Sequence, residues 1–153
     1  MTFTLTTFAR SLANYLAPML PGFTFYEDPN QQHLDPPCAF LQTRYGRWEQ
    51  EVGGYWIRKL GLDLTCLEDY NLHDLQQRYQ RTAEALDEVM ALFPYSDGSD
   101  KLPVLLRAHD RDWRIDLDAL HYKFELRLRV SRRVEVARMQ DMELKLILNI
   151  RSD

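Results

Sequence analysis

The chain has 153 residues, of which 45% are hydrophobic and 27% charged, and its formal net charge at pH 7 is −4. This length and this balance are typical of one globular domain that buries its own core, and they exclude an intrinsically disordered chain. No apolar run approaches the ~18 residues of a membrane span, and the net acidity disfavours a dedicated nucleic-acid-binding protein.

The N-terminal segment and the two cysteines give no sign of export. Residues 1–16 carry no early positive charge and no unbroken apolar core, so we expect no signal peptide. Cys38 and Cys66 each lie in an apolar, strand-like run, and nothing else in the sequence indicates an oxidising compartment. We therefore expect two buried free thiols, and two cysteines without a nearby histidine also make a poor zinc site.

The first predicted element is an amphipathic helix. Apolar residues recur there at three- and four-residue steps, and they are Leu5, Phe8, Leu12, Tyr15, Leu16 and Met19. Pro18 and Pro21-Gly22 end this helix. A short strand over Phe23–Glu27 follows, and then a polar, proline-containing loop from Asp28 to Pro37.

The next segment predicts a long β-hairpin. Cys38–Gln42 is a buried strand, and Arg44–Glu51 continues it with exposed, charged residues. Gly53-Gly54 is a turn signal, and Tyr55–Leu67 is the return strand. Apart from Arg58, the even positions of the return strand are apolar, so we expect one face in the core and the other in water.

A second amphipathic helix follows the hairpin. Its apolar stripe contains Leu72, Leu75, Tyr79, Leu86, Met90 and Phe93. Charged residues, Asp87 among them, cover the opposite side. Asn71 is the expected N-cap and Pro94 the expected end.

The last third of the chain predicts four strands. Lys101–His109 is expected to pair with Asp112–Leu117 across a tight Asp110-Arg111 turn. The apolar positions then change from odd to even, which indicates a bulge or a tight corner near Asp118-Ala119. The strand after this corner runs from Leu120 to Val130, and a final strand runs from Met142 to Ile150.

The element order is therefore helix, three strands, helix, four strands, within a single domain over residues 1–153. Strands joined by hairpins form antiparallel sheets. The apolar sides of two amphipathic helices can both be buried against one face of such a sheet. We predict an α+β fold, with a mostly antiparallel or mixed sheet and both helices packed on one face. The other face of the sheet should be largely polar.

Residue constellations that would indicate an enzyme are missing from the sequence. There is no glycine-rich phosphate loop and no nucleophile elbow, and the four histidines do not have metal-ligand spacing. Two carboxylate-rich segments are better explained as a solvated hairpin end and as turn residues. The first contains Asp110, Asp112, Asp116 and Asp118 beside His109 and His121, and the second contains Glu27, Asp28 and Asp35. We therefore assign no catalytic, cofactor-binding or metal-binding residue.

The basic residues on the strands are open to two interpretations. They guard edge strands against aggregation, or they form a surface for an acidic partner or DNA. Arginines interleaved with aromatic residues near Tyr45 favour an interface, although a hairpin anchored in its own core is an equal alternative. The candidate interface residues are Arg44, Arg47, Trp48, Arg58, Lys123, Glu125, Arg127, Arg129, Arg132 and Arg133.

Three blocks of the sequence together suggest a family. The first comprises Phe25–Asp28, Gln31-Gln32 and Leu34–Phe40; the second is Tyr55–Leu64, and the third is Asp116–Phe124. In this order they resemble the phage tail terminator family of prophages and tail-like particles of Gram-positive bacteria. The family pattern has an aromatic strand end, a glutamine loop, a Pro-Cys-Phe-Phe-like strand, an aromatic-Arg strand and an Asp-Gly-Val-Leu-His-Phe strand. Ala119 stands where this pattern has glycine.

The resemblance implies a structural virion protein without enzymatic activity or cofactor. Tail terminators form a ring, typically a homohexamer, which caps the tail tube, ends its polymerisation and offers a docking surface to the head or neck. The implied partners are further copies of the chain, the tail tube protein, the sheath protein where there is one, and neck or connector proteins. DNA would pass through the ring only as cargo, and no membrane is involved. Assembly would take place in the cytoplasm of the host bacterium.

Two alternatives remain open on the sequence. A neck or head–tail connector subunit is also a small ring protein. A small α+β enzyme or ligand-binding domain would instead need a deep pocket with two or more convergent titratable groups.

Overall fold

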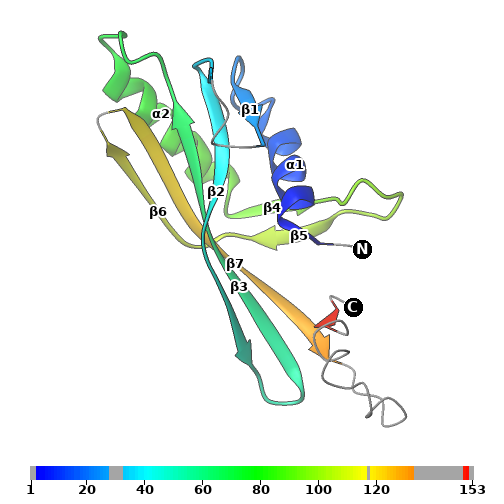
Figure 1. The fold of residues 1–153 in the computed structure, drawn as a ribbon. Helices are drawn as coiled ribbons and strands as arrows, with labels where there is room; N and C mark the ends of the chain where they lie inside the picture. The colour runs from blue at the N-terminus through cyan, green and yellow to red at the C-terminus, as the bar shows by residue number, and fades with distance from the viewer. Residues whose placement is uncertain (1–2, 28–32, 117, 133–149, 152–153) are drawn as a thin grey trace.

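The computed structural model describes residues 3–27, 33–116, 118–132 and 150–151, and these form a mixed β-sheet with two helices and a separate two-stranded ribbon (Figure 1). In the order of the chain, the elements are α1 (Leu5–Leu16), β1 (Thr24–Tyr26), β2 (Cys38–Gln50), β3 (Tyr55–Leu67), α2 (Leu75–Val89), β4 (Leu92–Tyr95), β5 (Val104–Arg107), β6 (His109–Asp116), β7 (Ala119–Arg132) and β8 (Ile150–Arg151).

The main sheet has the strand order β1-β2-β3-β7-β6, and β8 pairs with β7. β1 runs parallel to β2, and the other pairs are antiparallel. Leu62 and Leu64 of β3 and Phe124 of β7 share one core with Leu12 of α1 and Leu86 of α2. Both helices therefore pack on the same face of the sheet, and the predicted α+β fold is confirmed.

α1 forms where the sequence places it. The side chain of Thr4 accepts a hydrogen bond from the Thr7 amide (3.1 Å), and the Thr7 hydroxyl accepts one from the Thr4 amide (2.9 Å), which closes a capping box. Phe8, Leu12 and Leu16 are buried at helical spacing. The helix ends before Pro18, as predicted.

α2 differs from the prediction at both ends. Its N-cap is Asp74 rather than Asn71, because residues 69–74 form a turn before the helix. It ends at Val89, and Pro94 lies in β4 rather than at the end of the helix. Phe93 is still buried in the core, but from β4. A proline is tolerated there because a two-stranded ribbon leaves one side of each strand unpaired.

Asp87 lies on the side of α2 that was expected to carry only solvated charges. Its carboxylate accepts hydrogen bonds from the Tyr122 hydroxyl (2.7 Å) and from Trp113 Nε1 (3.1 Å), and its carbonyl accepts one from Arg111 (2.7 Å). Asp87 thus fastens α2 to β6 and β7.

The predicted hairpin between Lys101–His109 and Asp112–Leu117 is wrong. β5 pairs with β4, and β6 begins at His109 and pairs with β7. Asp110 adopts a φ of 50° beside a register shift between His109 and Asp112, so this expected turn is a bulge in β6. The expected tight corner near Asp118 is confirmed, because Asp116 pairs directly with Ala119.

The face of β3 that was expected in water is partly buried. Leu60, Leu62, Leu64 and Cys66 pack into the core as predicted, but Asp63 and Thr65 on the opposite face are also buried. β3 is the central strand, and polar side chains from β2 and β7 cover its outer face. The prediction of a polar face holds, while the prediction of a solvated one does not.

The two cysteines are buried and unpaired. Cys66 lies opposite Ala39, whereas Cys38 lies opposite Leu67, so the two thiols are on opposite faces of the sheet. Burial raises the pKa of the Cys66 thiol, which keeps it protonated at neutral pH. Of the predicted final strand, all but Ile150 lies outside the described residues. Neither helix in the described part of the chain has the length and apolarity required to cross a bilayer.

Candidate interaction surface

The far halves of β2, β3 and β7 continue beyond the two helices as a three-stranded projection (Figure 1). We call residues 44–60 and 125–132 the arm. The β2–β3 turn at Gly53-Gly54 forms its tip, with positive φ angles of 92° and 81°. The arm contains most of the residues that the sequence nominated for an interface.

A bulge in β2 sets the two faces of the arm. The register between β2 and β3 shifts between Thr43 and Tyr45, so Arg44 is an extra residue without a partner in the register. After this shift, Tyr45 and Arg47 share a face with Glu125 and Arg127. We call this the polar face of the arm, and the opposite one, which continues from the core, the helix-side face.

Glu125 is the centre of the polar face. Its side chain is only 5% exposed, and it accepts hydrogen bonds from the Tyr45 hydroxyl (2.5 Å) and from Arg127 Nε (2.7 Å). Arg47 lies 3.9 Å away. Burial alone would raise the pKa of Glu125, but the hydrogen bonds from Tyr45 and Arg127 outweigh it and hold this pKa below its usual value. Glu125 is thus a buried, compensated carboxylate.

Gly61 makes this contact possible. Tyr45, Gly61 and Glu125 lie side by side in the register of β2, β3 and β7. A Cβ atom on Gly61 would stand 2.1 Å from the Tyr45 ring. The tyrosine therefore reaches across the central strand to the carboxylate because the residue between them has no side chain.

The remaining charges of the polar face are also paired within the chain. Arg127 Nη2 donates to the Asp110 carboxylate (3.0 Å) in the bulge of β6, and Arg127 Nη1 lies 3.5 Å from His109 Nδ1. Arg129 pairs with Glu51 (2.8 Å) and lies over the Tyr55 ring, while Lys59 pairs with Glu49 (2.9 Å). Burial and the charges of Arg127 and Arg107 lower the pKa of His109, so this ring stays neutral at pH 7.

The helix-side face of the arm combines aromatic residues with an arginine. Trp48 lies opposite Arg58 in the register and is 45% exposed. The Arg58 guanidinium is 5.9 Å from the ring centres of both Trp48 and Phe3. Tryptophan and arginine are among the residue types enriched at the energetic hot spots of protein interfaces.

The arm unites six of the ten nominated residues as exposed or half-buried side chains: Arg44, Arg47, Trp48, Arg58, Arg127 and Arg129. Glu125 is in the arm but buried. Lys123 lies outside the arm, between Asp63 and Asp112 in the register. Arg132 ends β7 opposite Ile150, and Arg133 lies outside the described residues.

The carboxylates near the β6–β7 turn fall into separate contacts. His121 Nδ1 lies 3.0 Å from Asp63, and its Nε2 lies 3.4 Å from Asp116, so each ring nitrogen faces a carboxylate. Asp118 is exposed at the β6–β7 turn, whereas Asp112 is exposed beside the bulge at the start of β6, opposite Lys123. No group of three or more His, Cys, Asp or Glu side chains in the described segments has an arrangement that could hold a metal ion. The sequence did not group Asp63 with these carboxylates, because it lies 58 residues from His121 along the chain.

The second carboxylate-rich segment also has a structural role. Glu27 pairs with Arg10 of α1 (2.8 Å), which holds the pKa of Glu27 below its usual value. The Asp35 amide donates to the Tyr26 hydroxyl (3.1 Å). Asp28 lies outside the described residues.

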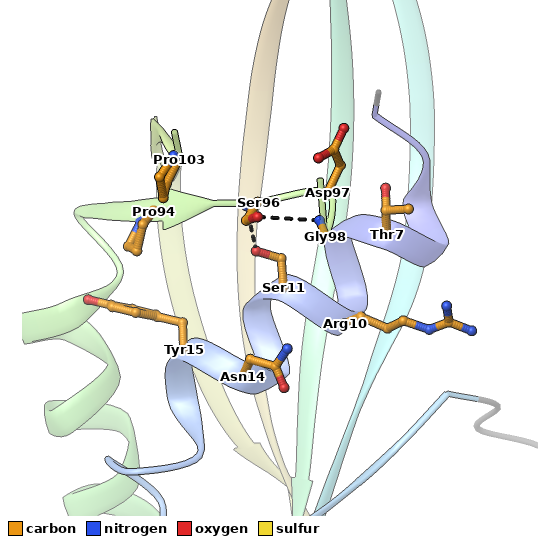
Figure 2. Close-up of a pocket in the computed structure, with 10 residues that line it drawn as sticks. All are labelled: Thr7, Arg10, Ser11, Asn14, Tyr15, Pro94, Ser96, Asp97, Gly98 and Pro103. Atoms are coloured by element: carbon orange, nitrogen blue, oxygen red, sulfur yellow. Dashed lines mark hydrogen bonds between the residues drawn. The ribbon is translucent and has the colours of Figure 1, made fainter. Parts of the chain in front are cut away.

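A groove of about 460 Å³ lies between α1 and the β4–β5 segment (Figure 2). Its serine hydroxyls accept hydrogen bonds from backbone amides of the same groove. The Ser11 hydroxyl accepts a hydrogen bond from the Ser96 amide (3.0 Å), and the Ser96 hydroxyl accepts one from the Gly98 amide (3.3 Å). Of its lining residues, Arg10 and Asp97 are charged, and Arg10 is paired with Glu27. These contacts hold the ribbon on α1.

Sequence reasoning missed the exposed apolar side chains of the β4–β5 segment. They are Leu92, Leu102, Val104 and Leu105. A signal was available, because Leu105 and Leu106 are adjacent and two neighbouring residues of a strand cannot face the same core. Leu106 packs against the core and Leu105 faces outward.

Comparison of the sequence with models of known protein families and with curated proteins found no match in either set. The fold and the surfaces of the molecule are therefore the basis for assigning a function.

Proposed function

We propose that the chain is a structural subunit of a virus tail, a tail terminator that assembles into a ring, most simply a homohexamer. The ring caps the tail tube, ends its polymerisation and offers the head or neck a docking surface. The subunit has no catalytic role and needs no cofactor. Its partners are further copies of itself, the tail tube protein, any sheath protein, and neck or connector proteins. It is assembled in the host cytoplasm and is part of the virion.

The arm is the observation that supports this proposal. Leu60 and Leu126 fix its base in the core, and its polar side chains are held by cross-strand ion pairs. A projection that is ordered before binding loses little conformational entropy when a partner binds. A ring also requires two different patches on each subunit. The projecting arm supplies one patch, and the body of the neighbouring subunit supplies the other.

A neck or connector subunit would share this geometry, so the test must separate the two positions in the virion. In a phage that lacks the gene for this chain, we expect tails of uncontrolled length, because nothing stops tube polymerisation. Electron microscopy of the lysate measures the tail lengths. Tails of normal length without heads would assign the chain to the connector instead.

Self-association is tested separately on the purified protein. Light scattering should give the mass of a closed oligomer, and negative-stain images should show rings. A protein that remains monomeric at high concentration, and does not bind isolated tail tubes, would contradict the proposed function.

A further inference from the structure

The exposed large hydrophobic residues of the described segments are concentrated on two projections. Of eight such residues, Trp48, Val52 and Tyr55 lie on the arm, and Leu92, Leu102, Val104 and Leu105 lie on the β4–β5 segment. Leu102 is 88% exposed and Leu105 is 65% exposed. Exposed apolar residues scattered singly are ordinary, but residues gathered on two projections indicate surfaces that a partner covers. We call Leu92–Arg107 the ribbon.

The two projections belong to parts of the chain with opposite charge. The arm holds seven basic and three acidic residues, a net charge of +4. Residues 61–124, which include α2 and the ribbon, hold thirteen acidic and seven basic residues, a net charge of −6. Glu84 and Glu88 are exposed on α2, two turns and one turn before Leu92. A basic aromatic patch and an acidic apolar patch therefore complement each other.

Within one copy, Phe3 lies between the bases of the two patches, 5.9 Å from the Arg58 guanidinium and 5.3 Å from the Tyr95 ring, but the exposed side chains of both patches remain uncovered. The ribbon crosses the molecule near the base of the arm and projects sideways, whereas the tip of the arm points away from it (Figure 1). Two different, complementary patches on one subunit define a heterologous, head-to-tail contact between copies. Such contacts close into a ring when the rotation between neighbours allows it.

The arm is better suited to a protein than to nucleic acid. Binding to a phosphate backbone needs free cationic groups. Arg127 and Arg129 are already neutralised by Glu125, Asp110 and Glu51. The helix-side face instead offers Trp48 stacked with Arg58, and the ribbon offers leucines, which have no counterpart in recognition of a phosphate backbone.

We propose that the arm of one copy binds the ribbon and the acidic face of α2 of the next copy. Trp48 meets the ribbon leucines, while Arg58, whose charge no ion pair among the described residues neutralises, faces Glu84 and Glu88. This inference rests on the proposed ring, and it names the two surfaces that would form it.

The experiment uses two full-length variants and a matched control. Trp48→Asp disables the arm and Leu105→Asp disables the ribbon. Tyr70→Asp alters the eighth exposed hydrophobic residue, which is 75% exposed and lies on neither projection. Circular dichroism melting verifies that each variant is folded, and Trp48→Ser and Leu105→Ser replace any that is not. The mass of each protein is measured by light scattering over a range of concentrations.

Each disabled variant alone should need a roughly tenfold or greater concentration to assemble, which is the loss expected from one interface hot spot. The Tyr70→Asp control should assemble as the wild type does. An equimolar mixture of the two disabled variants should give a dimer and stop there. In that dimer one intact arm meets one intact ribbon, and the two outer surfaces are both disabled.

Three results would overturn the inference. Normal assembly of Leu105→Asp would exclude the ribbon, and a mixture that stays monomeric would exclude arm–ribbon pairing. If Leu105→Asp assembles normally while Trp48→Asp loses binding to a duplex DNA oligonucleotide, the arm is a DNA surface. In all three cases the wild type still forms rings, so the proposed function stands. A wild type that remains monomeric removes the inference, and one that also fails to bind isolated tail tubes removes the proposed function as well.

Discussion

Glu125, Tyr45 and Gly61 show how one residue without a side chain shapes a surface. The buried carboxylate of Glu125 would be unfavourable without partners, because burial disfavours its charged form. Tyr45 supplies one hydrogen bond from two strands away, across Gly61, and Arg127 supplies another. A charge that the sequence pattern places on the surface is therefore part of the fold.

Glu125→Gln should reduce stability at neutral pH and change its dependence on acid. The folded state holds the pKa of Glu125 below its usual value of 4.5. This group therefore stabilises the fold at pH above that value, and the contribution is lost as the pH falls through the lower, folded pKa. Urea denaturation at pH 7 and at stepwise lower pH should show the difference between wild type and variant shrinking in acid. If the difference in the free energy of unfolding between wild type and variant did not change with pH, the pKa of Glu125 would be the same in the folded and unfolded states.

Gly61→Ala should force Tyr45 off the central strand. The added methyl would meet the aromatic ring, and overpacking of this kind costs about 1–3 kcal/mol. Denaturation with urea measures the loss. Gly46→Ala is the matched control, because the nearest atom to an added Cβ there is a leucine methyl at 3.5 Å, an ordinary contact. Equal stability of both variants would contradict the packing of Tyr45 on Gly61.

At the level of elements, the arm and α2 depend on different interactions. The arm extends beyond the helices, so cross-strand ion pairs and its core-anchored base hold it in shape. α2 is fixed by apolar packing and by two polar anchors, Asp87 and the Tyr79 hydroxyl, which donates to the Asp118 carbonyl (3.0 Å).

Reversing the charge of Arg127 should destabilise the fold, whereas reversing Arg129 should not. Arg127→Glu would place a carboxylate beside buried Glu125 and Asp110, leaving the buried charge uncompensated. The Arg129 side chain is 65% exposed, and exposed ion pairs contribute at most about 1 kcal/mol. Thermal denaturation of the two variants compares them directly. A similar melting temperature for both would show that Arg127 is only a surface charge.

Leu86→Ala should lower the free energy of unfolding by about 2–5 kcal/mol, because Leu86 is fully buried between α2 and the sheet. Urea denaturation measures the change. Glu84→Ala, on the exposed side of the same helix, is the control and should stay within about 0.5 kcal/mol of the wild type. An unchanged midpoint for Leu86→Ala would contradict the packing of this helix.

At the scale of the whole molecule, the chain separates its charge between a basic arm and an acidic body. Like charges facing across an interface cost several kcal/mol, so this separation favours head-to-tail contacts over arm-to-arm contacts. Screening by salt weakens such a preference. We expect the concentration at which the wild type assembles to rise as NaCl increases from 0.05 to about 0.5 M. Light scattering at each salt concentration checks this, and assembly that is indifferent to salt would mean that charge does not orient the subunits.

The sequence by itself determined the elements that depend on local patterns. Helical spacing located α1 and the stripe of α2, alternation and Gly53-Gly54 located the β2–β3 hairpin, and a change of phase located the turn before Ala119. These signals lie within about 15 residues, which is the range over which periodicity and turn residues act. The α+β class followed from their order.

Only the tertiary structure decided which strands pair and which charges are exposed. β5 pairs with β4 across the connecting loop of residues 96–103, whereas β6 pairs with β7. Glu125 is buried because Tyr45 and Arg127 come to it from different parts of the register. Asp63 meets His121 for the same reason, across 58 residues of chain. Such contacts depend on strand register over long separations, and the residues themselves do not encode that register locally.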